Sequence, residues 1–157
     1  MSERELTAIY HRRIDMVYRL CFSMMGSRQD AEDAAQTVFL KLMRREEGFA
    51  DEEHEKAFLI VMARNQCHDF RRQWWRRNTK ALDESMPGGE IPGEQGEARQ
   101  LLLKLPPRLR ILLVLHFVEG YRLADIAQML GMNLNTVKSR LRSAKKKLKM
   151  EWGRQEE

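Results

Sequence analysis

Cysteine is scarce in this chain of 157 residues, which holds only two, Cys21 and Cys67. The two are far apart in the sequence and form no Cys-x-x-Cys pair, so neither a disulfide framework nor a zinc site is indicated. Each lies in a segment with helical periodicity. We therefore expect two reduced, buried thiols.

Long apolar runs are also lacking. The first residues, MSERELTAIYHRR, are charged and contain no apolar core of a signal peptide. No run approaches the roughly 18 apolar residues of a membrane span. We expect a cytoplasmic protein without membrane insertion. The hydrophobic fraction of 43% is nevertheless enough for real cores, which excludes disorder throughout.

Groups arranged for catalysis are lacking as well. The four histidines, His11, His54, His68 and His116, are scattered along the chain. Cys67 and His68 are adjacent, so on a helix their side chains point in different directions. No carboxylate pair or nucleophile motif accompanies them. We expect no enzymatic activity, no metal site and no cofactor.

Charge is present in abundance but is unevenly distributed. Residues 1–78 hold 14 Lys and Arg against 13 Asp and Glu, and residues 79–97 hold 1 against 5. Residues 98–157 hold 13 against 5, a net charge of +8. The C-terminal part therefore has the composition of a polyanion-binding domain.

Residues 121–149 contain the most informative pattern, two helices joined by a tight turn. Gly131 is a candidate C-cap for the first helix and Asn133 a candidate N-cap for the second, which is much more basic. Apolar side chains form one stripe along the second helix and polar or basic side chains point the opposite way, as a helix that enters the DNA major groove requires. The stripe contains Leu134, Val137, Leu141, Ala144 and Leu148, and the opposite face contains Asn135, Ser139, Arg142 and Lys146.

Three longer helices are predicted upstream. The first covers residues 3–25 as one or two helices ending at Gly26, and the second follows an N-cap at Ser27 or Asp30. We expect Ala34, Val38, Phe39 and Leu42 to be buried. The third begins near Asp51, with Phe58, Leu59, Met62 and Ala63 on its core face.

The end of the third helix combines cations with two tryptophans, in the run Arg71 to Arg77. Cations beside aromatic rings suit single-stranded nucleic acid, because bases stack on indoles while guanidinium groups contact phosphates. By composition alone, a tryptophan in a helix is about twice as often a core residue as a nucleic-acid contact. Adjacent side chains point about 100° apart, however, so we expect at least one of Trp74 and Trp75 at the surface.

Residues 79–97 contain four of the nine glycines, two of the four prolines and an acidic excess, which is typical of a linker. A short helix at 98–105 is predicted to end at Pro106, and Pro107 suits the first position of the next helix. The apolar segment that follows predicts a core made of Ile111, Leu112, Val114, Leu115 and Val118. The fold class is therefore all-α, with two small helical domains, 1–78 and 98–157, joined by the linker 79–97.

Four segments together resemble the extracytoplasmic-function (ECF) class of bacterial RNA polymerase sigma factors, in the family's order and spacing. They are 30-DAEDAAQTVFLKL-42, 62-MARNQCHDFRR-72, 105-LPPRLRILLVLHFVEG-120 and 131-GMNLNTVKSRLRSAKKKL-148. The resemblance covers nearly the whole chain. It implies a transcription initiation factor that binds the polymerase core and selects promoters without catalysing a reaction.

The resemblance also implies roles for individual residues. It assigns contact with the clamp of the polymerase β′ subunit to Asp33, Gln36, Phe39 and Leu40. It assigns recognition and opening of the −10 promoter element to Asn65, Asp69, Arg71, Arg72, Trp74, Trp75 and Arg76. It places Thr136, Lys138, Ser139, Arg140 and Arg142, beside Asn135 and Lys146, at the −35 duplex. An anti-sigma factor is a further implied partner.

The sequence departs from the family pattern at three places. Phe58 stands where Trp is common, Thr37 stands where an acidic residue is common, and 143-SAK-145 replaces a common RAR. We expect the last change to alter phosphate contacts and promoter preference. The alternative left open by the residues is a stand-alone helix-turn-helix regulator whose N-terminal half senses a ligand or partner.

Overall fold

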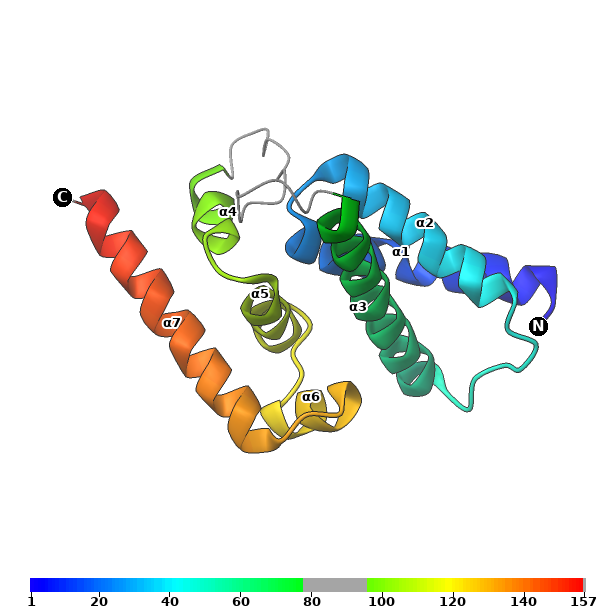
Figure 1. The fold of residues 1–157 in the computed structure, drawn as a ribbon. Coiled ribbons are helices and arrows are strands. Elements are labelled where there is room, and N and C mark those ends of the chain that lie inside the picture. Colours follow the sequence, from blue (N-terminus) through cyan, green and yellow to red (C-terminus); the bar gives the residue numbers. More distant parts are fainter. Residues whose placement is uncertain (78–95, 157) are drawn as a thin grey trace. The chain divides into compact units, whose positions relative to one another are not determined.

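The computed structural model describes residues 1–77 and 96–156, without the side chains of Trp75, Arg77, 96–99 and 151–156. The described residues form helices and no strand, which confirms the all-α prediction. The chain divides into two units, one containing α1 to α3 and the other α4 to α7 (Figure 1). Most of the predicted linker, residues 79–95, lies outside the described residues.

The first unit contains α1 (Glu3–Met25), α2 (Arg28–Met43) and α3 (Glu52–Arg77). Ser2 and Glu5 form a capping box at the start of α1, and Gly26 ends it with a φ of 73°. A left-handed residue favours glycine because it has no Cβ. Ser27 rather than Asp30 is the N-cap of α2, since its hydroxyl accepts a hydrogen bond from the Asp30 amide. The predicted end at Gly26 is confirmed, and of the one or two helices expected before it the structure has one.

The core of this unit lies between the three helices, which all pack against one another. All four residues predicted to be buried on α2 are buried. On α3, Leu59 and Ala63 are buried as predicted, whereas Phe58 and Met62 are only half-buried and Ile60 is buried in addition. The Phe58 ring instead lies 4.5 Å from the Arg45 guanidinium, which also lies 4.7 Å from the Phe49 ring. This cation–π contact joins the α2–α3 loop to α3.

Both cysteines belong to this core. Cys21 on α1 and Cys67 on α3 are free and fully buried, which confirms the prediction for them. A hydrogen bond with Cys21, together with burial, raises the pKa of the Cys67 thiol well above its usual range. A thiol that stays protonated is a poor nucleophile, so this pair is structural.

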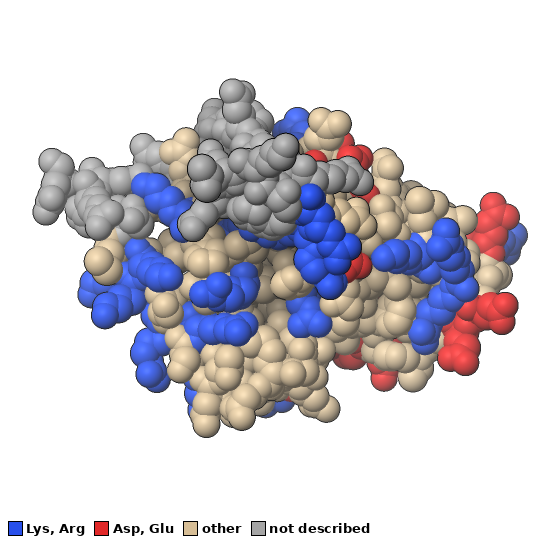
Figure 2. All heavy atoms as spheres, viewed as in Figure 1, with Lys and Arg blue, Asp and Glu red and all other residues tan. Residues whose placement is uncertain are grey.

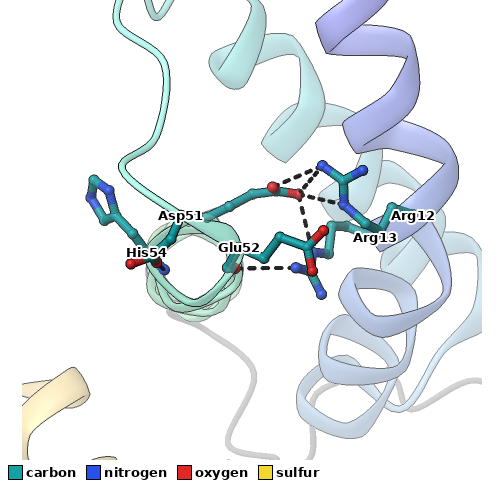
Figure 3. Close-up of polar contacts among 6 residues, drawn as sticks. Arg12, Arg13, Asp51, Glu52 and His54 are labelled. Carbon is teal, nitrogen blue, oxygen red and sulfur yellow. Dashed lines mark hydrogen bonds and ion pairs between the residues drawn. The ribbon is translucent and has the colours of Figure 1, made fainter.

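A buried carboxylate joins α1 to α3. Glu55 is 4% exposed, and its carboxylate accepts hydrogen bonds from Arg12 at 2.9 and 3.0 Å and from Arg13 at 3.1 Å. Arg13 also donates to the Glu52 carbonyl at 3.1 Å. In Figure 3, both guanidinium groups reach from α1 toward the first turn of α3. The contact fixes the start of α3 against α1, and so helps to set the direction of the rest of α3.

The second unit contains α4 (Gly96–Leu103), α5 (Pro107–Leu113), a π-helical turn η1 (Val114–Val118), α6 (Leu123–Leu130) and α7 (Leu134–Glu156). Pro107 is the first residue of α5, as predicted. Helix α4 begins at Gly96, two residues before the predicted start at Ala98. Gly96 and Glu97 are thus helical rather than part of a linker.

One core prediction for this unit is wrong. Ile111, Leu112 and Leu115 are buried, but Val114 is half-buried and Val118 is 61% exposed. The reason is the π turn, in which the Glu119 amide donates to the Val114 carbonyl at 2.9 Å. A π turn holds more residues than an α turn, so Val118 rotates away from the face that contains Leu115. Phe117, at 58% exposed, is carried outward with it.

Candidate nucleic-acid interfaces

The turn between α6 and α7 has the geometry of a helix-turn-helix. Gly131 ends α6 with a φ of 66°, and the Met132 amide donates to the Ala127 carbonyl at 2.8 Å. The Asn133 side chain then accepts a hydrogen bond from the Asn135 amide at 2.8 Å, which caps the start of α7. Both predicted caps are confirmed. They fix the direction of α7 relative to α6.

Helix α7 is held by one face only. Val137, Leu141 and Ala144 are at most 4% exposed, and they pack against α5 and α6. The opposite face carries short polar groups and cations and is in solvent, as predicted. The exposed residues among those assigned to the −35 duplex are Asn135, Thr136, Lys138, Ser139, Arg142 and Lys146, and Arg140 is half-buried.

These seven residues do not all lie on one face of α7. At about 100° per residue, Asn135, Ser139, Arg142 and Lys146 lie within about 60° of one another, and Lys138 borders them. Thr136 and Arg140 lie on the other border, toward the apolar stripe. Lys and Arg gather over α7 in the space-filling view (Figure 2). A helix with this surface can enter the major groove and contact bases and phosphates together.

Arg108 near this surface was not predicted from the sequence, whereas Ser143 was expected to alter phosphate contacts. Arg108 on α5 and Ser143 on α7 line an open hollow of about 490 Å³ together with Leu109, Ser139 and Arg140. The signal for Arg108 was its place as one of two arginines in an otherwise apolar helix. Its meaning depends on the packing of α5 against α7, which the sequence does not specify.

The second candidate interface is the C-terminal half of α3. Asn65, Arg72 and Arg76 are exposed and Asp69 is half-buried. Their spacing places all four within about 60° on one face of the helix. Asp69 and Arg72 form an ion pair. This face therefore combines an amide, a carboxylate and cations, which can both donate to and accept from bases.

The other predicted residues of α3 lie elsewhere. Arg71 and Trp74 are half-buried and fall on the far side of the helix from Asn65, and the side chain of Trp75 lies outside the described residues. Burial lowers the pKa of the Arg71 guanidinium. The structure thus separates the six predicted residues whose side chains it describes into one face with Asn65 and an opposite, half-buried side.

Two further polar residues belong beside the exposed face. Arg64 donates to the Asn65 side-chain oxygen at 3.2 and 3.3 Å, which orients the Asn65 amide. His68 is exposed and lies one helical turn from both Arg64 and Arg72. Burial and the positive charges of Arg64, Arg72 and Arg71 lower the pKa of His68, and the negative charge of Asp69 only partly offsets them. From its sequence position alone, this histidine is only one of four scattered candidates for catalysis.

The predicted polymerase-binding residues lie on α2. Asp33, Gln36 and Leu40 are exposed, Leu40 by 58%. Phe39 differs, because it is 8% exposed and its ring packs edge-on against Tyr10 at 4.9 Å. Phe39 therefore joins α2 to α1, and the exposed apolar side chains near it are those of Tyr10, Leu40 and Met43.

Among the side chains that the structure describes, no three His, Cys, Asp or Glu residues gather as a metal site requires. Within residues 1–77 and 96–156, none of the helices combines the length and apolar composition of a membrane span.

Comparison with known families matches both units. The chain matches the family model of Sigma-70 region 2 over residues 9–77 and that of Sigma-70, region 4 over residues 95–148. These ranges contain both candidate interfaces.

Individual relatives agree with this match. The chain is 30% identical to RNA polymerase sigma-E factor of Streptomyces antibioticus, over 94% of this chain and 84% of that protein. It is 28% identical to ECF RNA polymerase sigma factor SigE of Mycolicibacterium smegmatis, over 90% of this chain but 59% of that protein. The fold is similar to that of the sigma factor RpoE of Bartonella quintana, solved with the anti-sigma factor NepR. The TM-score is 0.74 at 21% identity, over 94% of each chain.

The match to region 2 bears on the alternative left open by the sequence. A stand-alone helix-turn-helix regulator would carry region 4 with an unrelated sensing domain, whereas region 2 is matched over all of α2 and α3. That alternative is wrong, and the chain is a transcription initiation factor that directs polymerase to promoters. The protein belongs to the sigma-70 family of RNA polymerase sigma factors, in its ECF class.

Proposed function

We propose that α7 recognises the −35 element as duplex while the exposed face of α3 captures the −10 element as single strand. The observation that carries the proposal is the surface of α7. Its apolar side is buried by Val137, Leu141 and Ala144, and its opposite side offers Asn135, Ser139 and Arg142 to solvent. Amide, hydroxyl and guanidinium groups on one helix face match the donors and acceptors of base edges in the major groove.

Capture of the −10 strand is assigned to Asn65, Asp69, Arg72 and Arg76. An unpaired base has free hydrogen-bonding edges, which a side-chain amide and a carboxylate can contact, while cations contact the phosphates. We assign Arg71 and Trp74 to support of this face, since both are half-buried. Strand opening then follows from differential binding: the separated strand gains contacts that the duplex lacks. No bond is made or broken by this chain, so we infer that it is not an enzyme.

Attachment to the polymerase clamp is assigned to the exposed side of α2. Asp33, Gln36 and Leu40 combine charge, hydrogen-bonding capacity and an apolar contact on one surface. We transfer Phe39 from direct contact to support, because its ring is held against Tyr10. The chain acts where the polymerase is, which places it in the cytoplasm. An anti-sigma factor that covers such surfaces is a further proposed partner, as the Bartonella relative has one.

The decisive experiment combines the chain with core polymerase on fragmented genomic DNA and maps the transcript starts. We expect starts at a defined set of promoters that share two sequence elements with fixed spacing. The variant Arg142→Ala should weaken dependence on the upstream element, and Asn65→Ala dependence on the downstream element. Starts that are the same with and without the chain would refute the proposal.

A further inference from the structure

We propose that the hollow between α5 and α7 binds one phosphodiester group of the −35 duplex, with Arg108 as a phosphate contact outside the helix-turn-helix. The inference rests on the proposed function of α7 and adds a residue to it. The hollow is lined by Arg108 and Leu109 of α5 and by Ser139, Arg140 and Ser143 of α7.

The chemistry of the lining favours an oxyanion. It contains two guanidinium groups and two hydroxyl groups, and none of its five residues carries a carboxylate. Guanidinium groups donate two parallel hydrogen bonds to phosphate oxygens, and hydroxyl groups donate one each. Two cations on different helices would repel each other in an empty hollow, and a bound anion removes that repulsion.

The position of the hollow favours DNA as the source of the phosphate. Ser139 lines the hollow and also belongs to the exposed face with Asn135 and Arg142. Along the circumference of α7, Ser143 and Arg140 lie about 40° and 100° beyond Ser139, on the side away from Arg142. A duplex placed against the exposed face therefore brings its sugar–phosphate backbone over the hollow.

The consequence is a fixed register for α7 in the groove. A phosphate held from both α5 and α7 sets the depth and the tilt of the helix, and such contacts orient a protein without reading sequence. The hollow is open, which suits a group carried by a large molecule. A free phosphate compound would share the same chemistry, so the experiment must separate the two sources.

The first measurement is the salt dependence of binding. The full chain is assembled with core polymerase and titrated with a −35 duplex at several salt concentrations. For Arg108→Ala we expect affinity to fall about three- to tenfold for all −35 sequences alike, and the log–log salt slope to become shallower by about 0.9. Arg108→Lys should restore the slope and Arg108→Gln should not. Arg4→Ala, which removes an exposed cation from α1, is the matched control and should leave the slope unchanged.

The second measurement locates the phosphate. A set of duplexes is prepared, each with one neutral methylphosphonate linkage. At one position we expect the methylphosphonate linkage to weaken DNA binding by the wild-type chain. The same linkage should have little further effect on DNA binding by Arg108→Ala. No coupling at any position would overturn the inference, as would an unchanged salt slope. Saturable binding of inorganic phosphate at Arg108, with DNA binding unaffected by Arg108→Ala, would assign the hollow to a free phosphate compound instead.

The two levels of the proposal can fail separately. If the wild-type complex binds the −35 duplex specifically but Arg108→Ala behaves like the wild type, only the hollow is assigned wrongly. If the wild-type complex shows no preference for any −35 sequence, the role of α7 fails and the hollow loses its DNA ligand with it.

Discussion

Helices α3 and α7 both carry a basic segment, at the C-terminal end of α3 and in residues 138–149 of α7, yet the two are built differently. On α7 the apolar side chains form one buried stripe, and the exposed residues opposite it include no carboxylate between Asn135 and Lys149. On α3 the cations alternate with half-buried groups, Asp69 pairs with Arg72, and a histidine lies among the arginines. Two basic helices of different build can therefore suit a rigid duplex in one case and separated bases in the other.

The difference follows from what each ligand exposes. A duplex offers regularly spaced phosphates and a groove that fits a helix, so a continuous cationic face is sufficient. A single strand offers base edges and faces, which require acceptors as well as donors. A carboxylate on α3 is consistent with this requirement, whereas one on the exposed face of α7 would repel phosphates.

The largest effect should come from breaking the buried stripe of α7. Val137→Asp places an unpaired charge at a fully buried position, and we expect a loss of about 4 kcal/mol or more, enough to unfold the second unit. Circular dichroism should show loss of helix, and −35 binding should disappear. Single-strand binding by the first unit should persist. The exposed substitution Gln128→Asp is the control, and loss of both activities in Val137→Asp would show that the two units do not fold separately.

Glu55→Gln should have the next largest effect, this time on the first unit. The substitution leaves Arg12 and Arg13 without their shared carboxylate. We expect the free energy of unfolding to fall by about 3 kcal/mol. This is the low end for a buried ion pair, because the Arg12 side chain is 39% exposed. Urea denaturation measures it. Glu53→Gln, at an exposed site on the same turn, should be close to neutral. Equal midpoints for the two variants would mean that the contact does not stabilise the start of α3.

Arg142→Ala and Arg76→Ala test whether α7 binds the duplex and α3 binds the single strand. We expect Arg142→Ala to weaken duplex binding about tenfold with a shallower salt slope, and Arg76→Ala to do the same for a −10 single strand. The slope change per contact should be smaller for the single strand, about 0.7 against 0.9. Fluorescence anisotropy on both ligands gives the comparison. A variant that weakens both ligands equally would contradict the assignment of separate faces.

The smallest effect should be a pH dependence confined to α3. Burial and the charges of Arg64, Arg72 and Arg71, against Asp69, hold the pKa of His68 below its ordinary value. In the free chain the unfolded state therefore binds more protons between these two pKa values. The folded state loses stability as the pH falls from the ordinary value near about 6.5 down through the lower pKa of the folded state. Phosphates beside His68 would raise its pKa again, so strand binding should take up a proton.

The measurement is single-strand affinity between about pH 5.5 and 8. We expect affinity to rise as the pH falls, and His68→Asn to remove the part of the change that occurs near the pKa of histidine. Duplex binding by α7 should show no such component, since none of its predicted contacts is a histidine. An identical pH profile for the wild type and His68→Asn would exclude His68 from the interface.

The sequence by itself determined the helices, their caps and the face of α7 that is buried. Gly26, Gly131, Asn133 and Pro107 act within a few residues of chain, so their effects are local and can be predicted. An apolar stripe such as that of Val137 to Ala144 likewise fixes which side of a helix is buried, whatever it packs against.

Tertiary structure decided what depends on a second element. The exposure of Val118 follows from a π turn whose hydrogen bonds the apolar pattern does not encode. The burial of Phe39 was predicted from the apolar pattern, but its ring contact depends on the position of Tyr10 on another helix. The hollow at Arg108 exists only because α5 packs against α7. Periodicity specifies the direction of a side chain on its own helix, but its partners are set by the packing of helices distant in sequence.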